Sequence, residues 1–397
     1  MPEATFDTLL VVFIAAAITP VLARWLKGVP VPAVVLEIAA GVLIGPEVLG
    51  LASEDAVTKD LANFGLSLLI FLAGYEVNPA RIRGRPLRFA AGGWLISLAA
   101  GLGIGALLAR SGNVSALVVG LALTTTALGT LVPILRDAGV LGDRFGTHAL
   151  AIGTIGEFAP IVAIALLLSG DNPGRTGLLL LAFVAVTLIV ALLASRPRSP
   201  AAMRFLGESL HTTGQLPVRL AMLILVSLIW LTLEFGLDVL LGAFAAGMVI
   251  RLASSGEQAS ELGSKLEGIG FGFFIPIFFV MTGVTFDIEG LLADTQDLLL
   301  LPLFLILFFL VRGLPILLYR SELERPDLVP LAFVSATALP LVVVITEIGV
   351  STGRMAPSLA TALVGAGMLS VVLFPALALR LKARSTQRPP ADTVTPP

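Results

Sequence analysis

Apolar runs of about 20 residues, joined by short polar loops, follow one another along most of this chain. A run of that length spans the hydrocarbon core of a bilayer as an α-helix. Only 13% of the 397 residues are charged, about half the share found in soluble domains. Strand-like alternation of apolar and polar residues is absent. The sequence therefore predicts an all-α polytopic membrane protein, to which we assign about thirteen transmembrane helices.

Composition excludes several kinds of chemistry. The chain has no cysteine and two histidines, which form no His-x-x-x-His pair, so thiolate catalysis and a zinc protease site are ruled out. The first residues, MPEATFDTLL, lack the basic region of a cleavable signal peptide. The proline-rich residues 384–397 are expected to form a disordered tail.

Basic residues predict the orientation. If the N-terminus lies outside, most of the 25 lysines and arginines fall in inner loops and in the C-terminal tail. This distribution follows the positive-inside rule. We expect a multi-pass protein of the inner (plasma) membrane with a cytoplasmic C-terminus. A twelve-span arrangement without the first segment remains open.

The two halves of the chain repeat each other weakly. Three short motifs recur in the same order at a spacing of slightly more than 200 residues. Equivalent spans differ by seven, an odd number, so the halves would insert with opposite topology, as in secondary transporters. The alternative is that small-residue motifs recur in any helix bundle. The matching pairs are IAAGVLIG from Ile38 with FAAGMVIR from Phe244, Phe64-Gly65 with Phe271-Gly272, and TALG from Thr126 with TALP from Thr337.

Two spans in matching places carry helix-weakening residues. The fifth span contains four threonines, Gly129 and Pro133, and the twelfth is interrupted from Ser335 to Pro340. Matched discontinuous helices predict a binding site at the membrane midplane, where free carbonyl groups can coordinate a cation. The alternative is that these residues only kink two packed helices.

One glutamate stands inside the otherwise apolar sixth span. Glu157 is placed at the depth of both breaks, and Thr154 lies on the same helix face. A carboxylate beside hydroxyl and carbonyl oxygens suits a hard cation and also takes a proton. We therefore predict a shared cation and proton site at Glu157, against the alternative of a structural carboxyl. The expected oxygen ligands around it are Thr125, Thr126, Ser335 and Thr337.

Other charged residues in the spans are assigned lesser roles. Arg312 lies past the middle of the eleventh span and needs an anion or the carbonyl end of a broken helix. Glu76 and Glu347 are secondary candidates, the first near an inner helix end and the second toward an outer one. Glu37 is expected to make a packing hydrogen bond.

The motifs together resemble cation:proton antiporter family 2, the monovalent cation:proton antiporters. The resemblance covers nearly the whole chain and rests on VPAVVLEIAAGVLIGPEVLG, GLSLLIFLAGYEVN, TTTALGTLVPILRDAGVLGDRFGTHALAIGTIGEF and LDVLLGAFAAGMVI with GFFIPIFFVMTGVTFD. It implies thirteen spans, with the fifth and twelfth crossing at the ion site, and a homodimer. The implied units are a scaffold of residues 1–79 and 214–285, a core of 86–169 and 296–383, and a linker helix of 175–195.

The resemblance also implies roles for three residues. Thr126 and Glu157 match the cation-binding residues of the family, and Arg312 matches its charge-compensating lysine or arginine. The chain departs from the family at Gly156, because relatives usually carry Asn, Asp or Gln before an aspartate where this chain has Gly156-Glu157.

These observations predict an antiporter that exchanges sodium or potassium for protons by alternating access, with a role in pH homeostasis. With Glu157 as the only carboxylate in the site, exchange would be one for one and electroneutral. No enzymatic activity and no cofactor beyond the transported ions are expected. Alternatives are a sodium-coupled organic-anion symporter of related fold, an intramembrane enzyme and a channel. The sequence does not decide between sodium and potassium.

Overall fold

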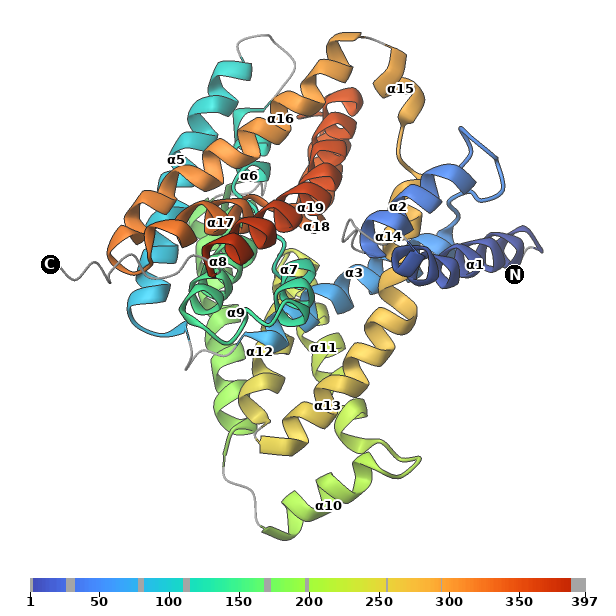
Figure 1. The fold of residues 1–397 in the computed structure, drawn as a ribbon. Helices are drawn as coiled ribbons and strands as arrows, with labels where there is room; N and C mark the ends of the chain where they lie inside the picture. Colours follow the sequence, from blue (N-terminus) through green and yellow to red (C-terminus); the bar gives the residue numbers. More distant parts are fainter. Residues whose placement is uncertain are drawn as a thin grey trace, which may run out of the picture.

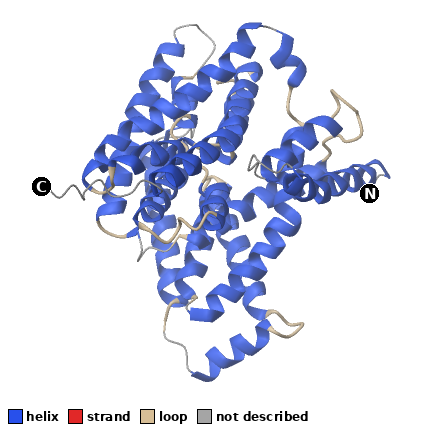
Figure 2. Ribbon diagram, viewed as in Figure 1, coloured by secondary structure: helices blue, strands red, loops and turns tan. Residues whose placement is uncertain are grey.

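The computed structural model describes residues 3–25, 33–77, 82–109, 115–167, 173–196, 200–254, 256–293 and 295–386. Regular structure in these ranges is helical throughout (Figure 2). The helices are α1 (Glu3–Trp25), α2 (Ala33–Ile44), α3 (Ala56–Glu76), α5 (Arg85–Ala109), α6 (Ala116–Ala122), α7 (Leu128–Asp137), α8 (Arg144–Leu167), α9 (Pro173–Ala194), α10 (Pro200–Leu210), α11 (Leu216–Glu234), α12 (Val239–Ala253), α13 (Gly256–Ile269), α14 (Ile275–Val284), α15 (Ile288–Ala293), α16 (Thr295–Gly313), α17 (Arg325–Ala336), α18 (Pro340–Ser351) and α19 (Pro357–Thr386). A π-helical turn, Gly270–Phe274, joins α13 to α14, and a 3-10 helix, Leu314–Ser321, extends α16.

The helices match the predicted membrane spans. Ten helical segments in the described ranges are long and apolar enough to cross a membrane, and α2 and α12 are shorter apolar helices. The fifth predicted span is the pair α6 and α7, and the twelfth is the pair α17 and α18. The all-helical membrane fold is therefore confirmed, while the count of thirteen crossings stays a prediction.

Two local expectations need correction. The short amphipathic helix α10 precedes α11 and is not one of the predicted spans. Gly129 and Pro133 lie inside α7 and do not interrupt it, since the break ends at Ala127. α19 continues to Thr386, and the predicted tail beyond it lies outside the described residues.

Helices from the two halves pack in matched pairs. α2 lies against α14, and α3 lies against α12 (Figure 1). Both contacts need glycine, because a Cβ on Gly41 would be 2.0 Å from the Val280 carbonyl oxygen and one on Gly247 would be 2.0 Å from the Phe71 carbonyl oxygen. Close backbone approach through small residues is how membrane helices gain contact area. The exchange of partners between the halves is what the predicted inverted repeat requires.

Around the two breaks, corresponding helices pack in the same way within each half. α5 packs on α6 and on α8, as α16 packs on α17 and on α19 (Figure 1). The two halves then meet at their breaks, because α8 packs on α17 and α6 packs on α18. This packing brings residues 123–127 and residues 337–339 together, although they are more than 200 positions apart in the sequence.

Candidate functional site

The two non-helical segments cross and are hydrogen-bonded to each other. The Ala127 backbone N–H donates to the Thr337 carbonyl oxygen at 2.8 Å. The neighbouring Thr126 N–H donates to the Gly156 carbonyl oxygen on α8 at 3.0 Å. Backbone groups released by the breaks are therefore partly paired across the crossing, as buried backbone groups must be. The predicted pair of crossed broken helices is present.

Glu157 lies at this crossing. Its side chain is buried, with 1% of the residue exposed. One carboxylate oxygen, Oε2, accepts the Leu128 backbone N–H at 3.0 Å, and the other, Oε1, has no hydrogen-bond partner among the described residues. Leu128 is the first residue of α7, so the carboxylate faces the positive end of a helix dipole. The helix end favours the ionised form, and the free oxygen can take a proton or a cation.

Arg312 is also buried, but its contacts are with neutral oxygens. Nε and Nη2 both donate to the Thr126 hydroxyl, at 3.0 Å and 2.7 Å. Nε also donates to the Ser335 carbonyl oxygen at 3.2 Å, and Nη1 donates to the Ser97 hydroxyl at 3.3 Å. The Ser335 carbonyl lies in the last turn of α17. Arg312 thus binds the carbonyl end of a broken helix, which is one of the two partners expected from the sequence.

The Thr126 hydroxyl is fully used in this arrangement. It accepts two N–H groups from Arg312 and donates its own hydrogen to the Ser335 carbonyl oxygen at 2.6 Å. A hydroxyl has one hydrogen and two lone pairs. The Thr126 hydroxyl can therefore coordinate a cation only where Arg312 has moved away.

Gly156 makes room for the contact between Arg312 and Thr126. A Cβ at this position would lie 2.6 Å from the Thr126 hydroxyl oxygen and 2.7 Å from Arg312 Nη2. Both distances are shorter than van der Waals contact. The guanidinium group thus occupies space next to Glu157 that a side chain at position 156 would need.

The remaining predicted hydroxyls are buried around the crossing and donate mainly to carbonyls of their own helices. Thr125 donates to the Ala122 carbonyl oxygen at 2.9 Å, Thr154 to Leu150 at 2.7 Å and Thr337 to Phe333 at 3.1 Å. The Ser335 hydroxyl is shared between the Arg312 and Ala332 carbonyl oxygens. Each hydroxyl oxygen keeps lone pairs that could face a cation.

Two cavities approach the site from opposite ends of α3. The cavity that we name the Glu76 cavity has a volume of about 640 Å³, and its walls include Gly129 and Thr130 at the start of α7. The second, the Glu347 cavity, has a volume of about 420 Å³ and is lined by Asn63 and Val343 among others. α3 has 21 residues, a length of about 30 Å. The Glu76 cavity reaches Gly129, the neighbour of Leu128, whose N–H binds Glu157.

The secondary carboxylates lie away from the crossing. Glu76 forms an ion pair with Arg136 at 3.2 Å, and Arg136 also lies 3.5 Å from Glu267, at the mouth of the Glu76 cavity. Glu347 lines the other cavity, and its role stays a prediction. Glu37 is buried in α2, and the packing hydrogen bond expected for it stays a prediction.

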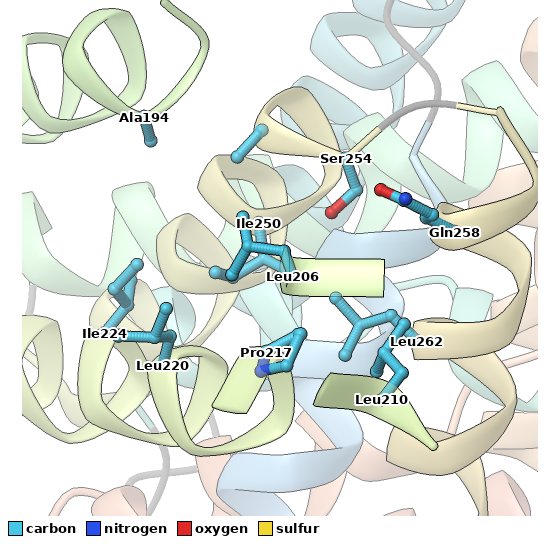
Figure 3. Close-up of a pocket in the computed structure, with 11 residues that line it drawn as sticks. Ala194, Leu206, Leu210, Pro217, Leu220, Ile224, Ile250, Ser254, Gln258 and Leu262 are labelled. Carbon is cyan, nitrogen blue, oxygen red and sulfur yellow. The ribbon is translucent and has the colours of Figure 1, made fainter. Parts of the chain in front are cut away.

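A third cavity is separate from this path. It has a volume of about 300 Å³ and lies between α10, α11, α12 and α13 (Figure 3). Its walls are mainly leucine and isoleucine side chains, with Ser254 and Gln258 at one edge (Figure 3). No charged residue lines it, so it offers an ion no charged partner.

Two serines at the crossing were not predicted from the sequence. Ser97 donates to the Val311 carbonyl oxygen at 2.8 Å and accepts from Arg312. Ser370 bonds to the backbone of Ala338, in the second unwound segment. Single serines in apolar helices usually bond to their own helix, so neither carries a signal on its own. The internal repeat could have pointed to Ser370, because it stands near the position that matches Glu157.

Comparison with known proteins decides the family. The family described as sodium/hydrogen exchanger, transmembrane, matches residues 10–379. The chain belongs to the sodium/hydrogen exchanger family. This membership confirms the resemblance drawn from the motifs and gives no support to the symporter alternative.

Individual relatives of this chain are also named as cation/proton antiporters. The chain is 28% identical over its full length to the putative Na(+)/H(+) antiporter YjbQ of Bacillus subtilis and spans 66% of that protein. It is 26% identical to the Na(+)/H(+)-K(+) antiporter GerN of Bacillus cereus, with 87% of this chain and 88% of that protein aligned. The structure of the sodium proton antiporter MjNhaP1 from Methanocaldococcus jannaschii superposes with a TM-score of 0.67 at 16% identity, over 97% of this chain and 98% of that one. The last comparison shows a shared fold.

Proposed function

We propose that this chain exchanges a monovalent cation, sodium or potassium, for protons by alternating access, with Glu157 as the group that carries either one. The observation that supports this most is the burial and incomplete hydrogen bonding of the Glu157 carboxylate. It is buried, its Oε2 accepts the Leu128 backbone N–H at a helix start, and its Oε1 has no hydrogen-bond partner among the described residues. An acid kept in that condition inside a membrane protein is functional by default.

The proposed cycle uses the two cavities in turn. Glu157 takes a proton from one side, crosses with the moving helices, releases the proton and returns with a cation. GerN is named for sodium and potassium as well as protons, which supports both cations as substrates. The scaffold, the core and the linker helix keep the residue ranges given above as part of this proposal, as do the homodimer, the N-terminus outside and the plasma-membrane location.

Arg312 has a defined place in this proposal. Its guanidinium covers the Thr126 hydroxyl and the Ser335 carbonyl oxygen. A cation that binds Glu157 and Thr126 together would repel the guanidinium and displace it from Thr126. The oxygen ligands then proposed are Glu157 and Thr126, with Thr125, Thr154, Ser335 and Thr337 nearby. Arg312 keeps its charge throughout, because a guanidinium is not deprotonated in proteins.

A flux assay tests the function. Purified protein in proteoliposomes with an internal pH dye should show proton movement on addition of sodium or potassium, and none on addition of choline. Lithium serves as a smaller cation for comparison. The Glu157→Gln variant, reconstituted to the same density, is the control for leak. Proton movement that is independent of the added cation, or that persists in the variant, would contradict the proposal.

A further inference from the structure

Ser370, in the middle of α19, is one of the most completely buried polar residues of the described chain, with 0% exposed. Its hydroxyl oxygen accepts the Ala338 backbone N–H at 3.0 Å. Its hydrogen is shared between the carbonyl oxygens of Ala338 at 2.9 Å and Gly367 at 2.7 Å. One side chain thus pairs both backbone groups of Ala338, which lies in the unwound segment before α18.

This arrangement mirrors that of Glu157 in the first half. Ala338 matches Ala127 in the internal repeat, and Glu157 binds the N–H of Leu128, the next residue along. Ser370 comes 213 residues after Glu157, close to the 211 that separate Ala338 from Ala127. A hydroxyl, that of Ser370, therefore occupies in the second half the position that the Glu157 carboxylate has in the first.

A glycine on each of the two helices supports the match. A Cβ on Gly153, four residues before Glu157, would lie 2.6 Å from a Leu128 side-chain carbon. A Cβ on Gly367, three residues before Ser370, would lie 2.9 Å from the Ala338 carbonyl oxygen and 3.4 Å from a Leu339 side-chain carbon. Leu128 and Leu339 are themselves matched positions of the repeat. α8 and α19 thus approach the two unwound segments in the same way.

Hydrogen bonds connect Ser370 to the carboxylate. Ser370 holds Ala338, and the adjoining Thr337 carbonyl accepts the Ala127 N–H at 2.8 Å. The residue after Ala127 is Leu128, whose N–H binds Glu157. A shift of the backbone at Ala338 would therefore be passed, through the hydrogen bond between Thr337 and Ala127, to the N–H that Glu157 Oε2 accepts.

We propose that Ser370 is the second-half counterpart of Glu157, a positioning residue that fixes the unwound segment before α18 and through it the Leu128 N–H on Glu157. The inference rests on the proposed function of Glu157. The proposal also explains why one chain would carry a single exchange site. At the matched position in the second half, the neutral Ser370 hydroxyl is hydrogen-bonded to both backbone groups of Ala338.

The test compares Ser370→Ala with Ser67→Ala in the proteoliposome flux assay. Ser67 is a matched control, because it is buried and donates only to the Asn63 carbonyl of its own helix. Ser370→Ala is expected to raise the half-saturating cation concentration about tenfold, the equivalent of one buried hydrogen bond, with a maximal rate within about twofold of the unmodified protein. Ser67→Ala should change neither quantity. Ser370→Thr, which keeps the hydroxyl, should restore the original half-saturating concentration.

Several outcomes would overturn the inference. An unchanged half-saturating concentration in Ser370→Ala, or an equal rise in Ser67→Ala, would show that Ser370 does not act on the site. A lower melting temperature with unchanged half-saturation would show that its role is only structural. If Ser370→Thr melts well below the unmodified protein, Ser370→Cys, which is closer in size, takes its place in the comparison. Failure of the unmodified protein to exchange ions would instead contradict the proposed function.

Discussion

Shortening Glu157 by one methylene group probes how the carboxylate is held. In Glu157→Asp the charge remains, but the oxygens withdraw by about 1.5 Å, the length of one carbon–carbon bond. The 3.0 Å contact from the Leu128 N–H to Oε2 would open beyond hydrogen-bonding distance. A hydrogen bond to a charged group contributes about 1.5–3 kcal/mol, so apparent cation affinity should fall about 10- to 100-fold.

The matched variant is Glu157→Gln, which keeps the length and removes the charge. Its amide oxygen can still accept the Leu128 N–H, so we expect folding to change by about 1 kcal/mol or less. Exchange should disappear, because an amide cannot bind a proton and a cation in turn. Dye-based flux at varied sodium or potassium concentration measures both variants, and thermal melting in detergent checks the fold. Wild-type half-saturation in Glu157→Asp would refute the assigned contact, and wild-type flux in Glu157→Gln would refute the assigned carrier.

Three further predictions concern the residues around the carboxylate. Thr126→Val should weaken apparent cation affinity and lower the free energy of unfolding by about 1.5–3 kcal/mol, because Arg312 loses its closest partner. Thr337→Val should weaken affinity with little loss of stability, since the Thr337 hydroxyl bonds only to Phe333. Equal melting curves for the two variants would contradict this difference. Gly156→Ala should cost about 1–3 kcal/mol and reduce exchange, because the new Cβ meets Thr126 and Arg312, and a variant as active and stable as the unmodified protein would disprove the close contact. Exchange should be one for one and electroneutral. In potassium-free vesicles, sodium-driven exchange should therefore generate no signal from a voltage-sensitive dye, although 100 mV is worth about 2.3 kcal/mol per charge. A potential generated by exchange would implicate a second carboxylate, Glu76 or Glu347.

Amino-acid sequence alone determined the class of the molecule and the location of its polar centre. Apolar runs of membrane-spanning length predict a helical bundle, because backbone groups in lipid must be hydrogen-bonded within the protein. Three weak matches in constant order predicted the repeat, and the two threonine- and proline-bearing spans predicted breaks in matched helices. Glu157 could be singled out since a carboxylate in such a run is costly unless it is used.

Only the tertiary structure decided what each polar group contacts. The sequence placed Arg312 near the site but could not show that its guanidinium lies on Thr126 and Ser335, and not on Glu157. Nor could it show that Gly156 leaves the space for that contact, or that Ser97 and Ser370 reach across to other helices. Periodicity and composition act along one helix, whereas these contacts join residues up to 215 positions apart. They depend on how closely separate helices approach, and that distance is set by packing of the whole bundle.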